Sequence, residues 1–166
     1  MNLVVVFLED RRLGLAAMGA LAIVVGSSMA WLHVPQPLIG NVTGYGLQDA
    51  GKITVLLGVG ALVLLFAHAR LRQRDLAVGA VLCGIGAAGF AAWYAFDADR
   101  NAARVLARVL SGGSAPLDPA SVTIFPSRIG AGVWVVIVGS AVLAVAAGLL
   151  SLRGAGTSEP ALRSSS

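Results

Sequence analysis

The chain has 166 residues, of which 57% are hydrophobic and only 12% are charged, and its mean hydropathy is +0.85. Soluble domains carry about 25% charged residues, so this composition excludes an ordinary water-soluble domain and indicates a membrane protein. The net charge of +4 does not indicate nucleic-acid binding, because the basic residues lie beside the apolar stretches and form no single patch interleaved with aromatics.

Four uncharged apolar stretches dominate the sequence, and each is long enough, or nearly so, to cross a hydrocarbon core of roughly 30 Å as a helix. They cover residues 13–32, 53–69, 76–96 and 129–152. We therefore predict an all-α fold, a four-helix transmembrane bundle with spans over about residues 13–32, 51–69, 75–96 and 129–152. The membrane domain covers residues 1–153, with outer loops over residues 33–50 and 97–128.

The first stretch follows Arg11 and Arg12 and superficially resembles a signal sequence. It is longer than a usual signal-peptide core, and residues 27–30 match a cleavage site poorly. We interpret it as a retained first span. The loop after it mixes prolines and glycines with apolar residues, a pattern that predicts turns with one apolar side against the bundle or the membrane.

The second and third stretches are joined only by residues 70–75, so we expect them to form an antiparallel hairpin. Small residues recur in the third stretch at a four-residue step, as Ala80, Gly84, Ala88 and Ala92. Such residues let helix backbones approach closely in lipid. The step indicates either a face for oligomerisation or ordinary packing within one bundle.

The second outer loop contains a helical pattern over residues 99–110. Arg100, Arg104 and Arg108 fall on one stripe at four-residue steps, while apolar side chains fall on another face. This pattern predicts a short amphipathic surface helix between spans three and four, with its apolar side in the membrane interface and its arginines towards lipid phosphates or a partner. A solvated helix packed over the bundle is the alternative.

Three tryptophans, Trp31, Trp93 and Trp134, lie near the outer ends of spans one, three and four. Amphipathic rings prefer the headgroup boundary, so they indicate an aromatic belt and, with the three arginines, are the candidate lipid or partner contacts.

Orientation follows from Lys and Arg near the span ends. Arginines 11, 12, 70, 72, 74 and 153 lie on one side, against Lys52 and arginines 100, 104, 108 and 128 on the other. Because Arg104 and Arg108 sit farther from their span, the contrast favours cytoplasmic N- and C-termini in a multi-pass protein of the plasma (inner) membrane. Residues 154–166 are polar and are expected to form a disordered cytoplasmic tail.

The residues that could carry chemistry are scattered. His33 and His68 are expected on opposite faces of the membrane, Cys83 is the single cysteine, and all acidic residues lie at the rims of the spans or outside them. Four hydroxyl residues within the spans are expected to bond back to their own helix carbonyls, namely Ser27, Ser28, Thr54 and Ser140. We predict no catalytic residues, no cofactor and no metal site.

The layout resembles a group of small proteins. Trp31 ends the first span, residues 46–52 (GLQDAGK) lead into the second, and Trp134 opens the fourth, in a sequence rich in Ala, Gly, Val and Arg. This plan is similar to uncharacterised four-span integral membrane proteins of high-GC, actinobacteria-like bacteria. The large first loop also resembles that of claudin-like tetraspans, although the paired loop cysteines of that family are missing.

Three classes of function are compatible with this sequence. The first is a non-catalytic accessory or scaffold subunit of a membrane assembly, whose partners are membrane lipids and other membrane subunits or further copies of the chain. The second is a small oligomeric transporter or channel lined by hydroxyls and backbone. The third is a membrane enzyme that acts on a lipid headgroup through Asp97, Asp99 and the arginine stripe over residues 100–108.

Overall fold

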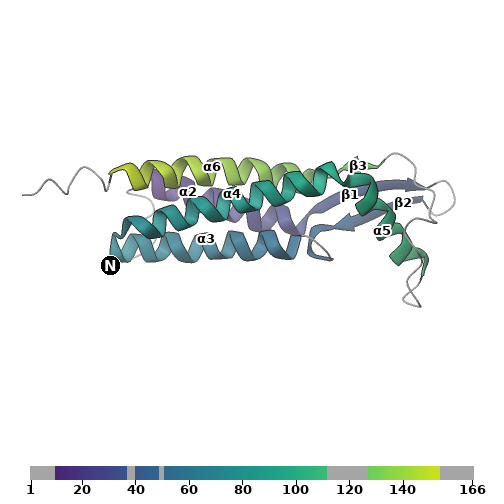
Figure 1. Cartoon of the computed structure of the whole chain (residues 1–166), viewed down its shortest axis with the longest axis horizontal. Helices are drawn as coiled ribbons and strands as arrows, with labels where there is room; N and C mark the ends of the chain where they lie inside the picture. Colours follow the sequence, from purple (N-terminus) through teal and green to yellow (C-terminus); the bar gives the residue numbers. More distant parts are fainter. Residues whose placement is uncertain (1–9, 37–39, 49–50, 112–126, 154–166) are drawn as a thin grey trace, which may run out of the picture.

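Four long helices form the body of the protein (Figure 1). The structure, a computed structural model, describes residues 10–36, 40–48, 51–111 and 127–153. The helices are α2 (Arg11–Ser28), α3 (Gly51–Leu71), α4 (Arg74–Phe96) and α6 (Ala131–Arg153). Each is long and apolar enough to cross a membrane, which confirms the predicted four-helix transmembrane bundle.

The helices form a ring in which α2, α3, α4 and α6 are successive neighbours and α6 closes onto α2. Helices α3 and α4 each bury one stripe at alternating steps of three and four residues. In α4 the buried residues are Ala77, Ala80, Gly84, Ala87, Ala91 and Tyr94. This 3.5-residue period is the pattern of left-handed helix packing, in which side chains of one helix enter the spaces between those of its neighbour.

Two of the four residues of the predicted small-residue step in the third span are buried inside this bundle. Ala80 and Gly84 are buried, and a Cβ atom on Gly84 would lie 3.3 Å from both the Ser140 carbonyl oxygen and a Leu143 methyl of α6. Of the alternatives left open by the sequence, the structure therefore places these two residues in packing within one bundle.

The turn between α3 and α4 makes the predicted antiparallel hairpin. Only two residues separate the helices, and Arg72 takes the left-handed backbone conformation, with φ of 55°. Its N–H donates to the His68 carbonyl at 2.8 Å, and the His68 ring nitrogen Nδ1 is 2.8 Å from the Gln73 carbonyl oxygen. The first of these bonds satisfies a carbonyl that the end of α3 leaves unpaired.

A small antiparallel sheet stands on one end of the bundle, which we call the sheet end (Figure 1). Its strands are β1 (Ala30–Gln36), β2 (Gly40–Tyr45) and β3 (Arg128–Ile129), in the order β2-β1-β3. A short 3-10 helix, η1 (Gly46–Gln48), follows β2. The sheet joins the first outer loop to the start of the fourth span, a pairing that the prediction lacked.

The predicted end of the first span at residue 32 is wrong. Helix α2 ends at Ser28, and Met29 is already extended, with φ of −76° and ψ of 173°. The Met29 carbonyl accepts a hydrogen bond from the Gly46 N–H at 3.2 Å, so the chain leaves the helix to pair with β2. Residues 30–32 are apolar enough for a span, but they lie in strand β1 instead, where Trp31 and Leu32 are buried.

Helix α5 (Ala98–Leu110) is the predicted amphipathic helix between spans three and four. The part of its apolar face that includes Val105 and Leu106 is buried against β1 and β2, where a Cβ atom on Gly44 would lie 3.3 Å from a Val105 methyl, while Val109 and Leu110 at its end are exposed. For Val105 and Leu106, the expectation that this face lies in the membrane interface is therefore wrong. The sheet covers it, because the hairpin that the prediction treated as a loop supplies a second apolar surface.

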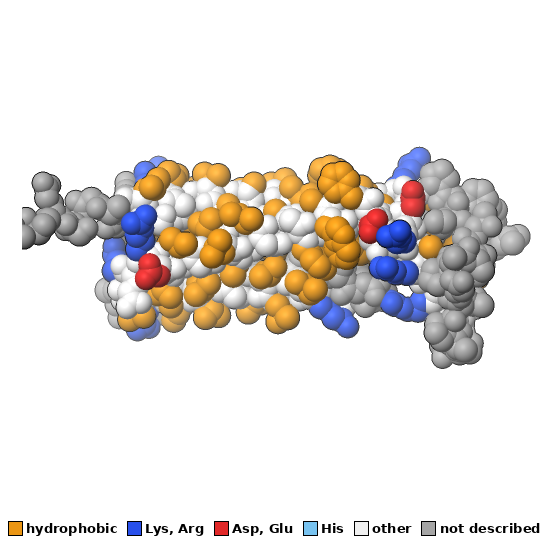
Figure 2. Space-filling view, viewed as in Figure 1, with side chains coloured by type: hydrophobic (Ala, Val, Ile, Leu, Met, Phe, Trp, Pro, Cys, Tyr) orange, Lys and Arg blue, Asp and Glu red, His pale blue; other side chains and the backbone are white. Residues whose placement is uncertain are grey.

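Charged side chains gather at the two ends of the molecule, and hydrophobic side chains cover the middle (Figure 2). The start of α2 and the end of α6 lie at the end opposite the sheet (Figure 1). There the Asp10 side chain caps α2 by accepting from the Arg12 N–H at 3.1 Å, and the Arg12 guanidinium reaches the Leu149 carbonyl at 3.4 Å. A band without charge between two charged rims is the surface expected of a protein that spans a bilayer.

Candidate functional site

The part of the protein with the most distinctive polar structure is the sheet end. We call β1, β2, η1, α5 and β3 together the cap. Helix α4 passes into α5 through Asp97, which ends one helix and begins the other. Strand β1 continues α2, and β3 leads into α6. Three of the four spans therefore continue directly into the cap, which couples its position to the bundle.

Trp31 lies at the junction of the bundle and the cap. It is fully buried, and its indole N–H donates to the Gly26 carbonyl at 2.9 Å. Its ring meets the Tyr94 ring edge-on, with centroids 5.0 Å apart. The prediction that Trp31 contacts lipid or a partner is therefore wrong, because its ring is enclosed by this chain.

The other two tryptophans are exposed on helices α4 and α6. Trp93 is 53% exposed and Trp134 is 58% exposed, both near the sheet end. Trp93 also contacts Phe90, with ring centroids 5.4 Å apart. Their positions are compatible with rings at the headgroup boundary.

Asn101 connects α4 to the arginine stripe, and the sequence analysis missed it. Its amide is buried and donates to the Tyr94 carbonyl at 3.1 Å, while its Oδ1 accepts from Arg104 at 3.2 Å. It lies four residues before Val105, on the apolar face of α5. A lone amide on an apolar helix face is the signal that could have found it, since buried polar groups need partners.

The arginines of α5 lie on its exposed side. Arg100, Arg104 and Arg108 are all exposed, and Arg100 lies 3.8 Å from Asp97 in an exposed ion pair. We call these three residues the arginine face. Such a surface suits carboxylates or phosphates, because guanidinium groups bind both through paired hydrogen bonds.

The polar side chains inside the bundle are hydroxyls. The Ser27 and Thr54 hydroxyl oxygens lie 2.6 Å apart across α2 and α3, and each is also within hydrogen-bond distance of a carbonyl of its own helix. Because the pair has only two protons, one hydroxyl donates to its partner while the other donates to its own carbonyl. Ser28 bonds to the Val25 carbonyl, as expected. Ser140 is 1% exposed and has no hydrogen-bond partner among the described residues, so the expectation that it bonds back to its helix is wrong.

The hydroxyl pair of Ser27 and Thr54 should stabilise the contact of α2 with α3. In a double-mutant cycle with Ser27→Ala and Thr54→Val, we expect a coupling energy of about 0.6 kcal/mol, and no more than about 1.7 kcal/mol, as found for hydrogen bonds between membrane helices. The free energy of unfolding in mixed detergent micelles measures it. Additive single effects would show that the hydroxyls bond only to their own helices.

The candidate chemical groups do not converge in the described chain. His33 lies in β1 at the sheet end, and His68 lies in the last turn of α3 at the other end. Among residues 10–36, 40–48, 51–111 and 127–153, no three His, Cys, Asp or Glu side chains are grouped so that they could hold a metal ion. Asp97 and Asp99 are partly or fully exposed, and Asp99 accepts from Ser127 at 3.0 Å.

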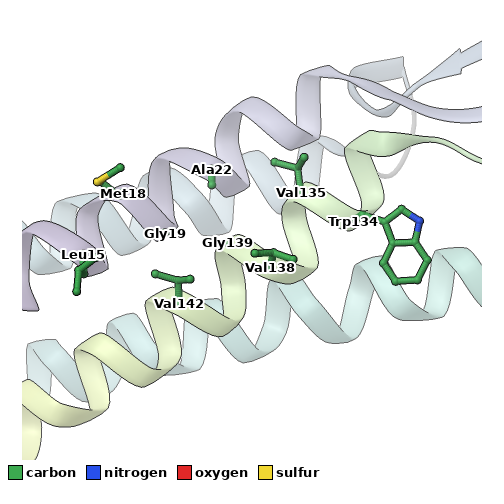
Figure 3. A pocket seen from close by; sticks show the side chains of 9 residues that line it. All are labelled: Leu15, Met18, Gly19, Ala22, Trp134, Val135, Val138, Gly139 and Val142. Atoms are coloured by element: carbon green, nitrogen blue, oxygen red, sulfur yellow. The ribbon is translucent and has the colours of Figure 1, made fainter.

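An apolar groove runs along the outer surface between α2 and α6 (Figure 3). Its volume is about 510 Å³. It is lined by Leu15, Met18, Gly19, Ala22, Trp134, Val135, Val138, Gly139 and Val142. Figure 3 shows Leu15 and Val142 pointing into the space between the two helices, with Trp134 at the end nearest the sheet.

Comparison with known proteins adds no assignment: no protein-family model, no curated protein and no solved structure matches the chain.

Proposed function

We propose that the protein is a non-catalytic accessory or scaffold subunit of a membrane assembly, and that it binds its partner through the arginine face of the cap. The observation that carries this proposal is the placement of Arg100, Arg104 and Arg108. They stand exposed on a helix that is held by a buried network, with Trp31, Tyr94 and Asn101 at its base. A fixed row of guanidinium groups favours a partner that presents carboxylates.

The packing of the bundle supports a structural role over a transport role. The buried faces of α3 and α4 consist mainly of Ala and Gly, and the hydroxyls of Ser27 and Thr54 bond to each other. A path for a polar solute across the membrane needs unpaired polar groups that can replace the hydration shell of the solute. Ser140 carries the one buried side-chain polar atom without a partner in the described chain, and a single hydroxyl does not line a path. The small side chains of this interior serve close contact between helices instead.

We also propose that the protein lies in the plasma membrane with its N- and C-termini in the cytoplasm and the cap outside. Arg104 and Arg108 lie on α5, away from the span ends, so they weigh less in the charge comparison. Near the span ends this leaves arginines 11, 12, 70, 72, 74 and 153 opposite Lys52, Arg100 and Arg128.

Crosslinking in native membranes tests the proposed partner contact. A photoreactive amino acid in place of Arg104 should give a discrete protein adduct that mass spectrometry identifies, and the same residue in place of Arg72, at the other end of the bundle, should not. In mild detergent, Arg104→Gln with Arg108→Gln should reduce retention of that partner about tenfold, since charge-assisted hydrogen bonds are lost while Gln keeps a polar group beside Asn101.

The matched control is Arg72→Gln with Arg74→Gln, which removes the same charge from the opposite end. Retention of the partner should also fall as salt is raised, because exposed charge pairs are screened. A chain that stays monomeric in mild detergent and gives no protein adduct from position 104 contradicts the accessory role.

A further inference from the structure

The groove between α2 and α6 follows from the close approach of the two helix backbones. A Cβ atom on Gly139 would lie 2.8 Å from both the Ala22 methyl and the Gly19 carbonyl oxygen. The two glycines therefore form the floor of the groove, where the backbones touch. The rims carry large side chains, with Met18 67% exposed and Val138 61% exposed.

Arg128 and His33 form a basic pair of side chains beyond the sheet end of this groove. Strand β1 continues α2 and β3 leads into α6, and the two strands pair with His33 opposite Arg128. Partners in a sheet register point to the same face, and both of these residues are exposed.

The sheet face that carries His33 and Arg128 is the one that α5 leaves open. The neighbouring residue Leu32 is buried and faces Gly44 and Val105, which places α5 on the other face of the sheet. Successive strand residues alternate between faces, so His33 and Arg128 lie on the side opposite α5. The acidic residue Asp99 belongs to α5, and its carboxylate accepts a hydrogen bond from the Ser127 hydroxyl.

We propose that this surface is a binding site for one anionic phospholipid of the leaflet at the sheet end. One acyl chain lies in the α2/α6 groove, the Trp134 indole lies at the level of the ester groups, and the phosphate contacts Arg128 with His33 beside it. Along α6 the groove runs from Trp134 to Val142, about 12 Å at the helical rise per residue, which is enough for much of an acyl chain. This proposal does not depend on the accessory role.

The groove favours a lipid chain over a third helix. Close helix contact in membranes uses exposed small residues, and the glycines of this groove already contact each other's backbone. The exposed residues that line the groove have flexible or bulky side chains, namely Leu15, Met18, Trp134 and Val138. The charge beyond its end matches a phosphate, because arginine pairs with phosphate through two hydrogen bonds.

Native mass spectrometry of the full-length protein in detergent tests the site with two probes, phosphatidylglycerol and diacylglycerol with the same acyl chains. One phosphatidylglycerol should be retained per chain, with about tenfold higher affinity than diacylglycerol. Val138→Trp, which fills the groove, should weaken phosphatidylglycerol binding about tenfold. Arg128→Gln should remove the preference for phosphatidylglycerol.

Two controls are matched to these changes. Val63 is also 61% exposed but lies on α3, diagonal to α6, so Val63→Trp should leave binding unchanged. Lys52→Gln removes a cation at the sheet end of α3, and it should leave the preference for phosphatidylglycerol intact. Met18→Trp provides a second groove-filling variant if Val138→Trp fails to give folded protein.

Three results would overturn the proposal. The first is equal binding of phosphatidylglycerol by the Val138→Trp and Val63→Trp proteins. The second is equal affinity of the wild-type chain for diacylglycerol and phosphatidylglycerol. The third is a dimer that Val138→Trp disrupts, which would assign the groove to a second copy of the chain.

Discussion

Replacing Gly19 by alanine is expected to lower the free energy of unfolding by about 3 kcal/mol, the upper part of the usual range for overpacking. The added Cβ atom would lie 2.6 Å from the Leu143 nitrogen and 2.7 Å from the Gly139 carbonyl oxygen. Both are backbone atoms of α6, so no side chain can turn away to make room. Helices α2 and α6 must separate, and the contact that closes the ring of helices is lost.

Unfolding in mixed micelles with a rising fraction of denaturing detergent measures this change. Gly148→Ala is the matched control in α6, because a Cβ atom there would have no atom within 4 Å among its described surroundings. We expect that control to change the free energy of unfolding by less than about 1 kcal/mol, the difference in helix propensity between Gly and Ala. Similar stabilities of the Gly19→Ala and Gly148→Ala proteins would show that α2 and α6 are not in backbone contact.

Replacing Trp31 by alanine is expected to cost about 3–5 kcal/mol and to loosen the cap from the bundle. The large ring fills the junction between α2, the sheet and α4, where it contacts Tyr94 edge-on and bonds to the Gly26 carbonyl. Its removal leaves a cavity and takes away one of the two donors of the Gly26 carbonyl, which also accepts from the Met29 N–H at 3.2 Å. Thermal unfolding should shift downward, and limited proteolysis should cleave the β1–β2 hairpin faster.

Two further variants separate the contributions of the ring and its N–H. Trp31→Phe keeps most of the ring but removes one of the two donors of the Gly26 carbonyl, for which we expect a loss of about 1 kcal/mol. Trp93→Ala removes a tryptophan that is 53% exposed at the same end, and we expect a smaller loss than for Trp31→Ala. If Trp31→Ala and Trp93→Ala were equally mild, Trp31 would not anchor the cap.

The amphipathic helix shows how far the sequence analysis could reach. The four-residue spacing of Arg100, Arg104 and Arg108 was enough to predict a helix with one charged face, and α5 confirms it. The partner of its apolar face depended on residues 30–45, more than 50 positions earlier. Hydrophobic periodicity reports that a face will be buried, but it does not report what will cover it.

The sequence by itself determined that the chain crosses a membrane with four helices, because a run of about 20 uncharged apolar residues has few other stable environments. Only the tertiary structure decided between residues that look alike in sequence. Trp31, Trp93 and Trp134 all lie near span ends, but one is enclosed and two are exposed. The difference arises because β1 pairs with β3, nearly 100 residues away, and such pairing depends on the assembled fold and leaves no local pattern.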